Sequence, residues 1–140
     1  MTRVDRRSVL AFGTAMATAT PLVGASKAAA AERYGPDEGT ELLPGVRQVD
    51  LSERQSPLSS YASVSMRDII FEPGAEIPVS SMENDMICHL LEGELEVVLD
   101  GEAFTVGENG VYSCAVGTEE SATNATDRVA IMRVTDLHSA

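Results

Sequence analysis

Sulfur-bearing side chains gather in the second half of this 140-residue chain, at Met82, Met86, Cys88 and Cys114. Side chains alternate along a strand, and alternation here places Met86, Cys88 and Leu90 on one face. If that face looks inward, Met82, Met86 and Cys88 line one cavity. Thioether and thiolate ligands select Cu(I), so the four sulfur residues are candidate ligands for a soft metal ion.

The same residues have a simpler interpretation, because Met and Cys behave as adaptable apolar side chains in protein cores. The sulfur atoms then fill the interior, and neither a metal ion nor another cofactor is bound. We take this as the default and keep copper binding as the alternative. Strand alternation sends His89 to the opposite face, so His89 is not counted as a ligand.

Glu120 is the candidate for acid–base chemistry. A carboxylate at the mouth of an apolar cavity has a raised pKa, which suits a general acid or base. The neighbouring Glu119 and the polar run 118–121 are instead typical of a solvated loop. The default expectation is therefore that no residue is catalytic.

Short segments of strand length dominate the chain after residue 45, and turn-forming Gly, Pro and Asp-Gly separate them. No helix is predicted there. The composition, with many Val, Ser and Thr and no Trp, also favours an all-β domain. The predicted strands are Val46–Leu51, Tyr61–Phe71, Met86–Leu91, Glu94–Leu99, Ala103–Val106, Val111–Cys114 and Val129–Leu137.

One hairpin is predicted with its register. Asp100-Gly101 is a dipeptide favoured by two-residue turns with positive φ. It lies between two alternating segments, so Val97 faces Phe104 and Leu95 faces Val106 on the buried side.

Two successive sequence motifs resemble the two motifs of the cupin superfamily. Gly74 and Gly93 have the separation of the first cupin motif, Gly-x5-His-x-His-x3-Glu-x6-Gly, but its three ligand positions hold Ser80, Met82 and Met86. The second motif, Gly-x5-Pro-x-Gly-x2-His-x3-Asn, is matched at two positions and replaced at three. Gly117 and Asn124 match, while Asn109, Ala115 and Glu120 stand for its first Gly, its Pro and its His.

The resemblance implies a cupin-type jelly-roll barrel over residues 46–137. A metal-dependent cupin dioxygenase or isomerase is disfavoured, because the usual ligand positions hold other residues. We expect a non-catalytic protein that binds a small ligand in its barrel, with a copper-binding cupin or an atypical cupin enzyme as alternatives. The expected pocket is lined by Ser80, Met82, Met86, Cys88 and Glu120.

The resembled fold also places the strand of Cys88 antiparallel to the strand that ends at Cys114. A disulfide between the two cysteines is therefore a further expectation, and it competes with copper for both sulfur atoms. Cupins commonly pair through covered sheet faces, and the apolar outward positions Ile87 and Leu91 lead us to expect a homodimer.

The N-terminal residues predict export. Paired Arg6-Arg7 precede a weakly apolar run, and residues 28–31 are all alanine, which resembles a twin-arginine signal peptide. We expect a cleavable signal over residues 1–31, a flexible lead-in over residues 32–45, and a periplasmic or extracellular mature protein.

Removal of the signal leaves six Arg, no Lys and 21 acidic residues, for a net charge of −15. Such a charge repels phosphate backbones and anionic lipid, so we expect neither a nucleic-acid partner nor a membrane partner after cleavage.

Overall fold

The computed structural model describes residues 33–140, and the predicted signal peptide lies outside the described residues. The described chain consists almost entirely of strands, and none of its helices is long and apolar enough to cross a membrane. The strands are β1 Thr40–Leu43, β2 Val46–Gln55, β3 Tyr61–Phe71, β4 Glu76–Ser81, β5 Asp85–Glu92, β6 Glu94–Leu99, β7 Glu102–Gly107, β8 Val111–Cys114, β9 Glu119–Thr123 and β10 Ala130–Ser139.

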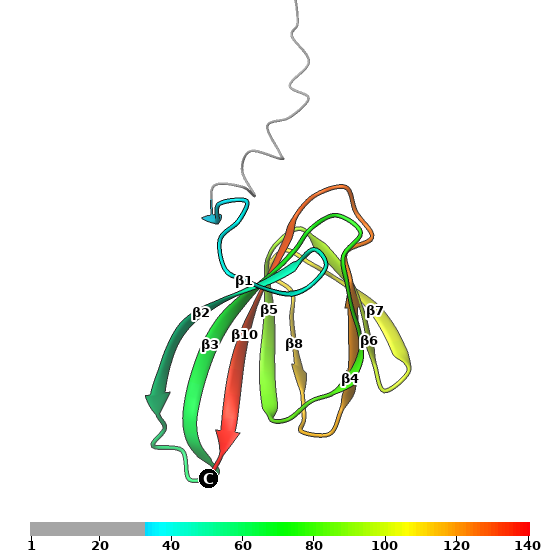
Figure 1. The fold of residues 1–140 in the computed structure, drawn as a ribbon. Helices are drawn as coiled ribbons and strands as arrows, with labels where there is room; N and C mark the ends of the chain where they lie inside the picture. The colour runs from blue at the N-terminus through cyan, green and yellow to red at the C-terminus, as the bar shows by residue number, and fades with distance from the viewer. Residues whose placement is uncertain (1–32) are drawn as a thin grey trace, which may run out of the picture.

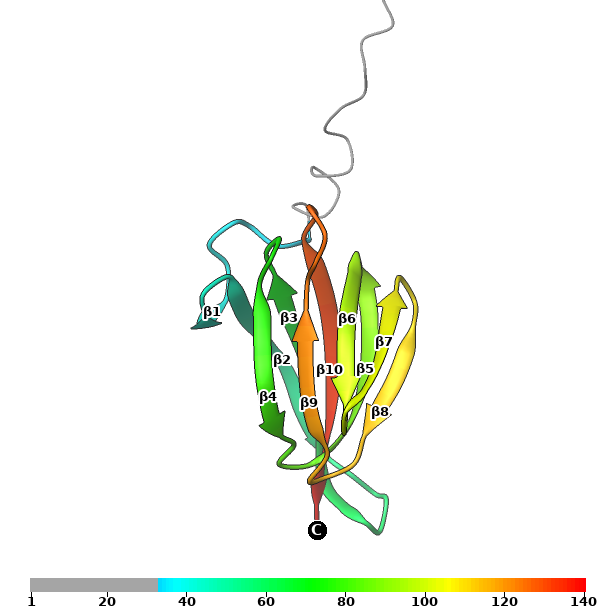
Figure 2. The same cartoon turned by 90° about the vertical axis from the view of Figure 1, so that its right-hand side faces the viewer.

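The strands form two antiparallel sheets that face each other (Figure 1). The larger sheet has the order β1-β2-β3-β10-β5-β8, and the smaller has the order β4-β9-β6-β7. In Figure 2 the smaller sheet lies in front of β2, β3 and β10. This arrangement confirms the all-β jelly-roll prediction.

The predicted hairpin is confirmed in its register. Val97 pairs with Phe104 and Leu95 pairs with Val106, while Asp100 and Gly101 both have positive φ. Positive φ at both central residues is the geometry that the Asp-Gly dipeptide favours.

Three strands were not predicted, namely β1, β4 and β9. The segment expected to be a flexible lead-in contains β1, which pairs with β2. Pro78 and several exposed residues hide β4, and β9 is a short polar segment that pairs with β4 and β6. Backbone pairing by neighbours therefore made strands of segments that lack a β-type side-chain pattern.

The core fills the space between the two sheets. Inward-facing side chains of both sheets build it, and alternation along each strand selects them. Its most deeply buried large members include Phe71, Leu90, Leu95, Met132 and Val46, all at most 2% exposed.

A second buried layer lies on the outer face of the larger sheet. Asp68 is fully buried there and receives two hydrogen bonds from Arg133, at 2.8 and 2.9 Å. Tyr34 also donates its hydroxyl hydrogen to Asp68, and Arg33 pairs with Glu92. Residues 33–39 thus form a strap, fixed to the outer face by side-chain contacts.

The contact between Tyr34 and Asp68 leads us to expect that the protein loses stability at alkaline pH. Burial, followed by the hydrogen bond to Asp68, raises the pKa of Tyr34 to about 12. The folded state therefore holds this proton more tightly than the unfolded chain, whose tyrosine pKa is about 10. Stabilisation by Tyr34 is complete below pH 10 and disappears as the pH rises towards 12.

Tyr34→Phe is expected to lower the free energy of unfolding by about 1 kcal/mol near pH 8, because one hydrogen bond to a buried carboxylate is lost. Urea unfolding of both proteins, measured from pH 8 to pH 12, checks this. The difference between them should shrink as Tyr34 ionises. A difference independent of pH would contradict the assignment.

Candidate functional site

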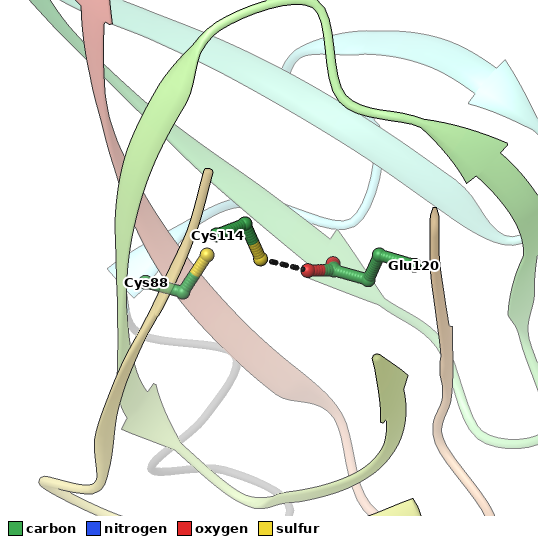
Figure 3. A group of neighbouring side chains, drawn as sticks. All are labelled: Cys88, Cys114 and Glu120. Carbon is green, nitrogen blue, oxygen red and sulfur yellow. Dashed lines mark hydrogen bonds between the residues drawn. The ribbon is translucent and has the colours of Figure 1, made fainter. Parts of the chain in front are cut away.

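Three ionisable side chains meet inside the barrel, as Figure 3 shows. Cys88 comes from β5, Cys114 is the last residue of β8, and Glu120 comes from β9 in the opposite sheet. One donor atom from each lies within 4.8 Å of the others. Their exposed fractions are 0%, 3% and 8%, so the group is enclosed by protein.

Strand parity brings the two sulfur atoms together. Met86 pairs with Cys114 and Cys88 pairs with Tyr112, so the cysteines are diagonal neighbours on the inward face of the larger sheet. The burial of Met86, Cys88 and Leu90 confirms which face of β5 looks inward. Glu120 reaches the pair because β9 belongs to the facing sheet.

The closest contact in the group is a hydrogen bond of 2.8 Å from the Cys114 thiol to Glu120 Oε2. The Tyr112 hydroxyl lies 3.5 Å from Glu120 Oε1 and 3.2 Å from the Met132 sulfur. Its ring meets Phe104 edge to face, with centroids 5.3 Å apart. Tyr112 is therefore held by packing while its hydroxyl faces the carboxylate.

Burial sets the protonation of the group. Loss of water raises the pKa of Glu120, although hydrogen bonds from Cys114 and Tyr112 and the positive charge of Arg67 oppose the shift. The pKa of the Cys114 thiol is raised by its hydrogen bond with Cys88, by burial and by Glu120. A cation that binds here must displace these protons, so its affinity would rise with pH.

A polar network adjoins the group on the inner face of the larger sheet. Arg67 donates to both oxygens of Asp136, at 2.9 and 3.3 Å, and to Gln48 at 3.0 Å. Asn84 donates to the same Asp136. The network holds Arg67 in place. The positive charge of Arg67 opposes the rise in the pKa of Glu120.

The expected pocket residues occupy different environments. Met86, Cys88 and Glu120 are buried, whereas Met82 is partly buried and packs against the core. Ser80 pairs with Glu120 in the strand register but is exposed. An irregularity in the β4–β9 register between Ile77 and Ser80 interrupts alternation, and β4 forms the edge of its sheet.

The cysteines are both free in this structure, so the expected disulfide is not formed in it. Their diagonal placement accounts for this. Diagonal neighbours in an antiparallel pair have Cα atoms about 7–8 Å apart, and a disulfide requires less than about 7 Å.

The sequence analysis missed Tyr112 and Arg67 as neighbours of the site. Alternation over residues 111–114 already puts Tyr112 on the face of Cys114, so one signal was present. Arg67 carried no such signal, because only the pairing of β3 with β10 places it beside Asp136.

A surface pocket of about 250 Å³ lies beside β5 and β8. Its lining includes Cys114 and Met86, together with Tyr61, Asp85 and Ser113. Asp85 is fixed there by hydrogen bonds from the Val116 amide and the Tyr61 hydroxyl, both of which lower the pKa of its carboxyl group. Ile87 and Ser113 face outward, so the pocket opens on the outer face of the larger sheet, opposite the inward-facing Cys114 thiol.

The chain resembles solved structures more than known sequences. No protein-family model matches it, and no curated protein sequence matches it. The cupin domain of Cnp3 from Schizosaccharomyces pombe superposes with a TM-score of 0.59 at 22% identity, over 71% of this chain and 69% of that one.

KdgF from Halomonas sp. gives a TM-score of 0.59 at 16% identity, over 71% of this chain and 84% of its own. An RmlC-like cupin from Shewanella frigidimarina gives 0.59 at 17% identity, over 76% and 88% of the two chains. Such identities establish shared architecture and no shared activity. Residues 33–140 therefore have the cupin fold that the two motifs predicted.

Proposed function

We propose that this chain is an exported cupin-fold protein that binds a soft metal ion, Cu(I), inside its barrel without catalysing a reaction. The observation that supports the proposal is the buried group of Cys88, Cys114 and Glu120, whose donor atoms lie within 4.8 Å of one another. The leader sequence supports export. An exported protein encounters copper, and thiolate ligands select Cu(I).

The donor set differs from the one that the sequence suggested. Two thiolates and a carboxylate replace a mixture of thioethers and thiolates, and Met82 lies at the end of β4 with its backbone bonded to Gly117 and Thr118. In a tetrahedral thiolate site the sulfur atoms are about 3.8 Å apart. The sulfur atoms of Cys88 and Cys114 would need to move by no more than about 1 Å to reach that separation.

The iron or manganese usual in cupins does not fit the residues at the motif positions. Those ions are held by imidazole nitrogens and carboxylates, whereas the positions here hold Ser80, Met82, Met86 and Glu120. A single carboxylate beside two thioethers is a poor set for such an ion. We therefore propose no iron- or manganese-dependent reaction with dioxygen in the barrel.

Binding of a small organic molecule is the second candidate function. The pocket of about 250 Å³ favours it, because apolar Ile87 and Leu137 and polar Tyr61 and Asp85 line the same opening. Such a mixed lining suits a small amphipathic ligand. Glu120 does not line this pocket, and an acid–base role would require a substrate to reach it inside the barrel.

Copper titration tests the first proposal. Anaerobic addition of Cu(I) to the reduced protein is expected to give one tightly bound ion per chain. Cys114→Ser and Glu120→Gln should each weaken binding, and Cys114→Ser by more than the 10- to 100-fold typical of residues that only support a ligand. Competition with a chromogenic Cu(I) chelator measures the affinity, and elemental analysis of protein from its native compartment tests occupancy.

Two further variants make the copper test specific. Ser113→Ala alters the outward face of β8 beside Cys114, and it should bind copper as the unmodified protein does. Met86→Leu separates the two donor sets, because only the sequence-based set uses its thioether. Loss of copper binding in Met86→Leu equal to that in Cys114→Ser would refute the proposed set, as would a protein that binds no copper.

We also propose that the protein is a homodimer through the outer face of β5 and β8. Ile87 and Val111 are 42% and 63% exposed there, and Leu91 lies on the same face of β5. Covering these side chains would stabilise a dimer.

Sedimentation equilibrium is expected to give twice the mass of the mature chain, and Ile87→Glu should give the monomer mass. An unmodified chain that remains monomeric at all accessible concentrations would contradict the dimer. Thermal unfolding of Ile87→Glu shows whether the variant is folded.

A further inference from the structure

We infer that Cys88 and Cys114 can exchange the metal ion for a disulfide bond with each other, so that oxidation closes the site. The inference rests on the proposed copper site and adds its regulation. The same two sulfur atoms supply two of the three donors, so the metal-bound and disulfide states exclude each other.

The two sulfur atoms already lie close together inside the barrel. Their separation is at most 4.8 Å, and both lie on the inward face of paired strands. A disulfide requires a sulfur–sulfur distance of about 2.05 Å, with the Cβ atoms about 3.8 Å apart. Closure therefore needs a displacement of a few ångströms at one cysteine.

β8 is the strand that can supply this displacement. It has four residues, it is an edge strand of the larger sheet, and among the described residues it pairs there with β5 alone. Cys114 is its last residue, directly before an exposed turn at Ala115–Gly117. Cys88 lies in the middle of β5, between β10 and β8, and is held on both sides.

Movement of Cys114 towards Cys88 would also break the hydrogen bond between Cys114 and Glu120, which is the third donor. The Cys114 thiol would leave Glu120, to which it now donates at 2.8 Å. Glu120 would keep the Tyr112 hydroxyl as its neighbour, at 3.5 Å. A metal ion thus loses both thiolates and the arrangement that aligns the carboxylate.

The oxidant we assign is a small disulfide molecule that reaches Cys114 at the end of the edge strand β8. The Cys114 thiolate attacks one sulfur of that molecule, releases the other half as a thiol and forms a mixed disulfide. Cys88 then attacks the Cys114 sulfur and releases the second half. Two cysteine thiols lose two protons and two electrons, and one disulfide molecule becomes two thiols.

Accessibility predicts the order of the two steps. Cys114 is 3% exposed and ends the edge strand β8, whereas Cys88 is completely buried and lies between β10 and β8. The first attack therefore belongs to Cys114. Cys88 acts as the resolving thiol from inside the barrel.

The test uses the full mature chain and bis(2-hydroxyethyl) disulfide under anaerobic conditions. Mass spectrometry of the metal-free protein is expected to show the loss of two hydrogen atoms, and a thiol assay should fall from two groups to none. Cu(I) added with ascorbate, which leaves disulfides intact, should then fail to bind. Reduction with a phosphine should restore one ion per chain, and copper loaded first should protect both thiols.

Single variants check the order of attack. Cys88→Ser should stop at a mixed disulfide on Cys114, because the resolving thiol is missing. Cys114→Ser should leave Cys88 unmodified. Modification of Cys88 in the second variant at the rate of Cys114 in the first would overturn the assigned order.

The outcomes separate the two proposals. A reduced protein that binds copper but keeps two thiols, or keeps its copper after the disulfide forms, refutes the redox inference alone. A reduced protein that forms the disulfide but never binds copper refutes the proposed function. It also refutes the competition between copper and the disulfide for the two sulfur atoms.

Discussion

The hydrogen bond from Cys114 to Glu120 joins the end of β8 to β9 across the barrel, and the chemistry of the interior depends on it. A carboxylate in such a place is costly unless it is bonded, because burial removes its water. Cys114 and Tyr112 supply hydrogen-bonding partners, and burial still raises the pKa of Glu120. Burial thus favours the neutral forms of Glu120 and of the Cys114 thiol.

Buried charge elsewhere is handled by arginine on the central strand pair. β3 and β10 carry one ion pair on each face: Arg67 with Asp136 on the inner face, and Arg133 with Asp68 on the outer face. Removing the arginine of such a pair leaves a buried carboxylate without its ion-pair partner, which is strongly destabilising. Residues 33–140 contain six arginines, and two of them neutralise buried carboxylates at these strands.

The sequence allowed the fold to be predicted wherever local signals determined it. The Asp100-Gly101 turn and the inward face of β5 follow from turn chemistry and alternation, and both are confirmed. β9 was missed because a polar strand owes its conformation to its neighbours. For the same reason Glu120 was expected in a solvated loop or at a cavity mouth, whereas it is buried. The exposure of Ser80 follows from a register irregularity that residue types do not reveal.

The turns of a cupin barrel and its inward-facing side chains are set by different requirements. The barrel can therefore keep its turns while other residues occupy the ligand positions. Gly93 has a φ of +79°, and a Cβ there would lie 2.7 Å from the Val129 carbonyl oxygen, so the turn requires glycine whatever the site binds. Inward positions need only fill space. Glu120 keeps a motif position, while Cys88 and Cys114 lie outside the motif positions on β5 and β8. The three side chains are buried, whereas Ser80 on the edge strand β4 is exposed.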